Sequence, residues 1–61
     1  MNVEDMKPGI ICMVKTKFYG DKMGVIVEKV TDRWGTRILI EPFDHPRQIS
    51  AEPQDIFPAF V

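Results

Sequence analysis

Apolar residues in this chain occur in short runs, and residues typical of turns separate these runs at regular intervals. Short apolar and β-branched runs bounded by glycine, proline or aspartate are typical of strands, whereas no window shows the period of an amphipathic helix. We therefore expect one all-β domain over residues 1–61. The predicted strands cover residues 10–14, 23–31, 36–41, 47–51 and 57–61, after a lead-in over residues 1–8.

The connection between the second and third predicted strands carries the clearest turn signal. Its sequence, Asp32-Arg33-Trp34-Gly35, suits a type I turn followed by a residue in the left-handed region. The Asp32 side chain can accept a hydrogen bond from the backbone two residues on. Gly35 tolerates positive φ because it has no Cβ. This pattern predicts an antiparallel hairpin.

Prolines mark the remaining boundaries. Pro42 and Pro46 enclose a second turn and exclude a central strand there, and Pro58 confines the last strand to a sheet edge. Pro53 suits the start of a single helical turn over residues 52–56, where no amide donor is needed. Five short strands with one helical turn before the last follow the order of a small SH3-like barrel, whose closure removes unpaired edges.

The stability of so short a chain must come from apolar packing. Binding to a partner or to a second copy can add to this stability. A single cysteine, Cys12, excludes an internal disulfide, and Cys12 with His45 cannot complete a usual zinc shell. Both faces of the first strand carry apolar residues, so part of the apolar set is expected outside the core, where it marks an interface unless the two chain ends cover it. The candidates are Ile11, Met13, Leu39, Phe57 and Phe60.

Composition excludes several classes of protein. No run approaches the length of about 20 apolar residues that a membrane-spanning helix needs, and the acidic start is unlike a secretory signal. The lone thiol favours a reducing, cytoplasmic setting. A net charge of −1 argues against binding nucleic acid by bulk electrostatics.

The segment from Gly9 to Gly24 joins a short apolar strand, a basic and aromatic loop, and a glycine that opens the second strand. This segment resembles the KOW motif of transcription-elongation and ribosomal proteins, with Cys12 and Val14 at the inward positions and Gly24-Val25-Ile26 matching the glycine-x-hydrophobic signature. The resemblance covers residues 9–41 and implies an SH3-like barrel that contacts RNA or DNA. Gly24 fits a barrel corner, where a strand residue needs to lack a side chain.

The loop after the first strand is the first candidate contact surface. It combines three lysines and two aromatic residues: Lys15, Lys17, Lys22, Phe18 and Tyr19. Cations can follow phosphates while aromatic rings stack on bases. The alternative is that one ring covers the barrel and the lysines are only solvated, and because adjacent residues on an extended chain point oppositely, one ring can be buried and the other exposed.

The hairpin tip is the second candidate contact surface. Trp34 lies there with Arg33 and Arg37 nearby. Tryptophan and arginine are the residue types that most often anchor interfaces. The alternative places Trp34 on its own sheet, over Arg37 or Leu39.

Catalysis, cofactors and metals are not expected from this sequence. Ser50 and His45 are the only serine and histidine, and a nucleophile needs a base and usually an orienting group. His45 is expected to be a solvated turn residue, and Cys12 a small buried hydrophobic residue.

These observations favour a non-catalytic binding module that docks on a larger macromolecule as an adaptor or regulator. A protein partner is favoured, because a dry interface needs only a few aromatic or arginine anchors, whereas nucleic acid needs several converging cations. The KOW resemblance implies that such a partner belongs to the transcription or translation machinery. Two alternatives stay open: a KOW-type domain that contacts RNA or DNA, and a small accessory subunit of an enzyme complex. The sequence leaves the oligomeric state undetermined.

Overall fold

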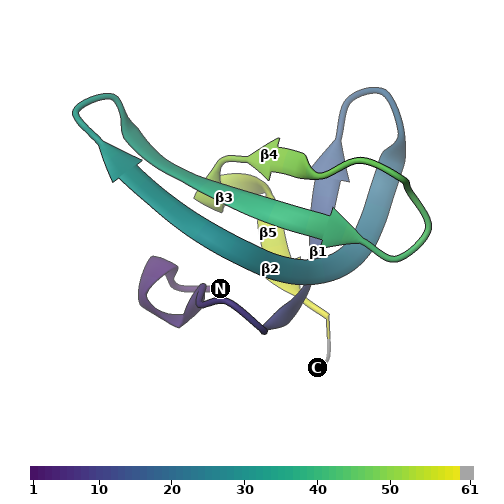
Figure 1. Ribbon diagram of the computed structural model, residues 1–61, viewed down its shortest axis with the longest axis horizontal. Helices are drawn as coiled ribbons and strands as arrows, with labels where there is room; N and C mark the ends of the chain where they lie inside the picture. Colours follow the sequence, from purple (N-terminus) through teal and green to yellow (C-terminus); the bar gives the residue numbers. More distant parts are fainter. Residues whose placement is uncertain (60–61) are drawn as a thin grey trace.

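Five antiparallel strands in one sheet make up most of the chain in the computed structural model, which describes residues 1–59 (Figure 1). The strands follow the order β4-β3-β2-β1-β5, so all neighbours in sequence are neighbours in the sheet except β5, which returns to β1. Two 3₁₀ turns, η1 and η2, precede β1 and β5. The elements are η1 (Val3–Asp5), β1 (Ile11–Thr16), β2 (Gly20–Asp32), β3 (Gly35–Pro42), β4 (Ile49–Ala51), η2 (Pro53–Asp55) and β5 (Ile56–Pro58).

The predicted all-β class and order of elements are confirmed, but several boundaries differ. β2 begins at Gly20, so residues 20–22, which were expected in a loop, pair with β1. Pro42 was expected in a turn and instead ends β3, buried and opposite Gly24. A proline is tolerated there because β4 pairs with β3 only from Ile38 to Ile40, so no strand beside Pro42 needs its missing amide donor. The next ladder bond is made by the Phe43 amide, which donates to the Met23 carbonyl at 3.0 Å. Residues 60 and 61 of the predicted fifth strand lie outside the described part of the chain.

β2 is the longest strand and curves from the β1–β2 loop to the hairpin tip (Figure 1). Its pairing with β3 shifts register between Ile26 and Glu28, so Val27 is the extra residue of a β-bulge. At Gly24 a Cβ would overlap the Glu41 carbonyl oxygen and lie 2.8 Å from the Pro42 Cα. The expectation that this position excludes a side chain is therefore confirmed, and the bulge and the glycine together bend the strand.

The core lies on the concave side of the sheet. Every strand contributes at least one buried side chain, and the lead-in adds Met6, which is 0% exposed. The expected lead-in over residues 1–8 is therefore part of the fold, since Met6 packs into the core from outside the sheet. The buried set is Met6, Cys12, Val14, Ile26, Ile38, Ile40, Ala51 and Ile56.

The predicted closure into a barrel is not confirmed, because the sheet is open, with β4 and β5 as its two edges among the described strands. The prediction that Pro58 belongs to an edge strand is confirmed. Each edge strand has three residues, so each edge presents only a short row of unpaired backbone groups. Within residues 1–59 no helix has the length and apolar character to cross a membrane.

Cys12 is buried in the core, and this burial raises the pKa of its thiol. Because the thiolate is the reactive form, both the raised pKa and the lack of access slow its reaction. We expect Ellman's reagent to react with the native protein at least about tenfold more slowly than with the urea-unfolded chain. Equal rates in stopped-flow measurements of the two states would show that Cys12 is accessible, contrary to its place in the core.

Candidate functional site

The β1–β2 loop is held in a fixed shape by its own side chains. The Thr16 hydroxyl accepts a hydrogen bond from the Tyr19 amide at 3.0 Å and donates one to the Gly20 carbonyl at 2.6 Å. Gly20 has a φ of 74°, which a residue with a Cβ rarely adopts. The loop therefore presents Phe18, 88% exposed, on a turn that the Thr16 hydrogen bonds close.

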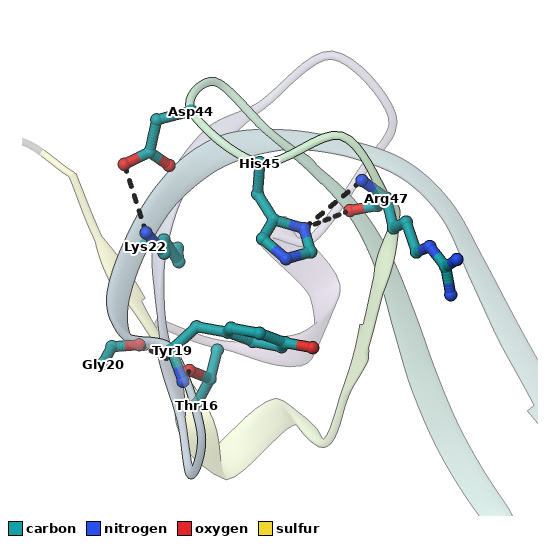
Figure 2. Close-up of polar contacts among 7 residues, drawn as sticks. All are labelled: Thr16, Tyr19, Gly20, Lys22, Asp44, His45 and Arg47. Carbon is teal, nitrogen blue, oxygen red and sulfur yellow. Dashed lines mark hydrogen bonds and ion pairs between the residues drawn. The ribbon is translucent and has the colours of Figure 1, made fainter.

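Two contacts join this loop region to the segment between β3 and β4 (Figure 2). The rings of Tyr19 and His45 lie with centroids 4.5 Å apart at an angle of 54°. Lys22 Nζ forms an ion pair with Asp44 Oδ2 at 3.2 Å. His45 was expected to be solvated, but it is half-buried, and its Nδ1 lies 3.3 Å from the Arg47 amide, which can donate to it. The two loops therefore support each other.

Three adjoining hollows lie beside β4 and η2. The largest, with a volume of about 510 Å³, lies between the β1–β2 loop and β4, and the second, about 410 Å³, reaches Trp34 at the hairpin tip. The third, about 230 Å³, joins them along Arg37 and Ser50. Glu52 lines all three. We call this continuous surface the β4 groove. In Figure 1, β4 lies between the β1–β2 loop and the hairpin tip.

The hairpin tip has the predicted turn. The Trp34 amide donates to Asp32 Oδ1 at 2.8 Å, and Gly35 has a φ of 128°. Trp34 does not pack on its own sheet: its side chain is 77% exposed, and the Arg33 guanidinium lies 4.3 Å from the ring centroid. A stacked guanidinium leaves the other ring face accessible to a partner.

The structure brings together six of the eight side chains predicted to contact a partner. The residues that line the β4 groove are Lys15, Lys17, Phe18, Tyr19, Trp34 and Arg37. Lys22 instead joins the loops through Asp44, and Arg33 covers one face of Trp34. Of the two predicted aromatic contacts in the loop, Phe18 is the more exposed and Tyr19 packs on His45.

Sequence reasoning missed the opposite wall of the groove. This wall comes from β4 and η2 and consists of Ile49, Ser50, Ala51, Glu52, Gln54 and Asp55. The Gln54 side-chain amide donates to Glu52 Oε2 at 2.9 Å, which fixes both side chains. The predicted helical turn at Pro53 was a signal for this segment, but its place opposite the loop depends on the long-range pairing of β5 with β1.

The groove is mixed in charge. Three cationic side chains (Lys15, Lys17 and Arg37) and two carboxylates (Glu52 and Asp55) line it. Among the described residues no group of three His, Cys, Asp or Glu side chains could hold a metal ion. Ser50 lines the groove, but His45 does not, and its Nδ1 contacts the backbone of Arg47 instead.

Comparison with protein-family models, curated proteins and solved structures finds no match to this chain.

Proposed function

We propose that this protein is a non-catalytic binding module that docks on a partner protein by taking up an extended segment in the β4 groove. The observation that carries the proposal is the continuity of the groove from Phe18 to Trp34. Phe18 and Trp34 are the two most exposed large apolar side chains among residues 1–59 and lie at the two ends of the groove. Exposed aromatic residues beside a concave surface are typical anchors of an interface.

The backbone of β4 supports the same mode of binding. β4 is an edge strand, so alternate amide and carbonyl groups face away from β3. An extended segment of a partner can pair with such an edge, and its side chains then enter the hollows on either side. Ile49 and Ala51 give the groove an apolar floor for those side chains.

The charges of the groove favour protein over nucleic acid. Three cations opposed by two carboxylates leave an excess of one positive charge. Each phosphate contact contributes about 0.7–0.9 to the salt slope, so tight binding of nucleic acid needs many cations without nearby acids. A peptide of mixed charge suits the surface better, with acidic residues near the lysines or Arg37 and a basic residue near Glu52 and Asp55.

We also propose that the fold is an open form of the SH3-like barrel. The strand order, the bent β2 and the 3₁₀ turn before β5 support this assignment, and the β4 groove is then the opening left beside β4. In this reading the module acts as an adaptor or regulator, and the partner supplies the catalytic or structural activity of the assembly.

Selection from a displayed library of random linear peptides tests the proposed function. We expect recovered peptides whose binding weakens by about tenfold or more in Phe18→Ala and in Trp34→Ala, as for aromatic anchors of other interfaces. The melting temperature should change little, because both side chains are exposed. Fluorescence anisotropy with labelled peptides measures the affinity.

Phe43→Ala is the matched control, because Phe43 is also an exposed aromatic residue, at 62%, and does not line the groove. An equal loss in Phe43→Ala, or failure to recover any peptide, would contradict the proposal. Binding of a single-stranded oligonucleotide at about 50 mM salt that is lost at about 200 mM would instead favour a nucleic-acid module.

A further inference from the structure

The convex face of β5, β1 and β2 carries an apolar patch that is separate from the floor of the β4 groove. Met13 on β1 pairs with Met23 on β2 and with Phe57 on β5, so the three side chains form one row across the sheet. Ile11 pairs with Val25 in the next row on the same face. We call these five residues the outer patch.

Each member of the outer patch remains partly accessible. Ile11, Met23 and Phe57 are 37–39% exposed, and Met13 and Val25 are half-buried. Five adjoining apolar side chains on three strands form a contiguous patch of the kind that marks an interface. A typical interface buries about 800 Å² on each partner, roughly a sixth of the 4569 Å² surface of this chain.

A pair of opposite charges borders the patch in the third row. Lys15 on β1 lies directly opposite Asp21 on β2. The Lys15 ammonium group lies 5.3 Å from the ring centroid of Phe57, which places it at the border of the outer patch, and Lys15 also lines the β4 groove, so it lies where the two surfaces adjoin. The three rows of β1 and β2 are therefore two apolar pairs followed by one charged pair.

We propose that the outer patch is the interface of a symmetric dimer of this chain, in which β1 of one copy lies over β2 of the other. A two-fold axis that runs between the two sheets, parallel to β1 and β2, places β1 of each copy over β2 of the other. Because this rotation does not move residues along the strands, each row of one copy faces the same row of the other. Met13 then faces Met23 of the second copy, and Ile11 faces Val25. Lys15 faces Asp21 of the second copy, so both charged pairs of the interface are attractive.

Other symmetric arrangements match the face less well. An axis perpendicular to the strands and centred on the Met13–Met23 row would place Lys15 and Asp21 against Ile11 or Val25 of the second copy, which would bury charges against apolar groups. The strand-parallel axis avoids this mismatch. Packed sheets keep their strands within about 30° of each other, and long side chains such as Lys15 can span the offset that this angle creates.

Sedimentation equilibrium measures the self-association. We expect the mean mass to rise from one chain toward two between about 10 µM and 1 mM protein, as for an interface at the small end of the usual range. Met23→Lys should keep the protein monomeric over the same range. A wild-type protein that stays monomeric at the highest concentration would overturn the proposal.

Charge reversal tests the arrangement of the two copies. Lys15→Glu places Glu against Asp21 across the two-fold axis, and Asp21→Lys places Lys against Lys15, so each variant alone should dimerise less than the wild type. A mixture of the two variants restores attraction at both pairs of the heterodimer. Titration of ¹⁵N-labelled Lys15→Glu with unlabelled Asp21→Lys should therefore shift amide signals of β1 and β2, and unlabelled Lys15→Glu should not.

Lys7→Glu mixed with Glu4→Lys is the matched control. Both residues lie in the exposed lead-in, and the two variants carry the same net charges as the two test variants. Stronger pairing in the test mixture than in the control, reduced at about 500 mM salt, supports the proposed dimer. Equal pairing in both mixtures would show attraction by net charge alone and would overturn the arrangement.

Discussion

Replacement of Met6 by alanine is expected to destabilise the protein by about 2–5 kcal/mol, the cost of truncating a buried methionine that leaves a cavity. Met6 is 0% exposed and enters the core from the lead-in, so no neighbouring strand residue can fill its place without moving. A domain of 61 residues has a total stability of roughly 3–9 kcal/mol. The variant should therefore lose roughly half of the stability of the protein or more, as measured by urea and thermal unfolding followed by circular dichroism.

Met1→Ala is the control for this prediction. Met1 belongs to the same lead-in but is 36% exposed, so its truncation should change the unfolding free energy by less than about 0.5 kcal/mol. If Met6→Ala were as stable as Met1→Ala, the lead-in would not be part of the core.

Gly24→Ala is expected to cost about 3 kcal/mol, at the upper end of the range for overpacked sites. The added Cβ would meet the backbone of Glu41 and Pro42, and backbone cannot move aside as a flexible side chain does. Relief requires β2 and β3 to separate at the point where β2 bends. Unfolding in urea measures the loss, which should appear as a lower midpoint with an unchanged slope.

Gly9→Ala separates steric overlap from backbone strain. Gly9 has a φ of 95°, but a Cβ there would meet nothing within 4 Å. Its substitution should therefore cost only the left-handed penalty, about 1–2 kcal/mol. A Gly24→Ala variant no less stable than Gly9→Ala would contradict the close approach of β2 and β3.

The sequence of strands along the chain and the hairpin at Asp32–Gly35 could be predicted because they depend on local signals, whereas the pairing of β5 with β1 is long-range. Alternation of apolar residues and the glycine after the turn act within a few positions of sequence. The burial of Met6 could not be predicted in this way, since an isolated methionine in a polar lead-in has no periodicity. The early start of β2 was missed because Gly20, Asp21 and Lys22 resemble a turn, and pairing with β1 outweighs their low strand propensity.

The candidate site was predicted on one side only. Phe18 and Trp34 were identified because exposed aromatic residues next to cations stand out in sequence. Glu52 and Gln54 carry no such signal, and their place between the two aromatic ends follows from tertiary structure. The pairing of Tyr19 with His45 depends likewise on two loops that meet only in the folded chain.

Chemical-shift mapping of a selected peptide on the ¹⁵N-labelled protein tests whether the β4 groove acts as one binding surface. We expect shifts at Phe18, along residues 49–55 and at the Trp34 indole in a single binding event. Shifts confined to one end of the groove, or to the outer patch on β1, β2 and β5, would contradict it.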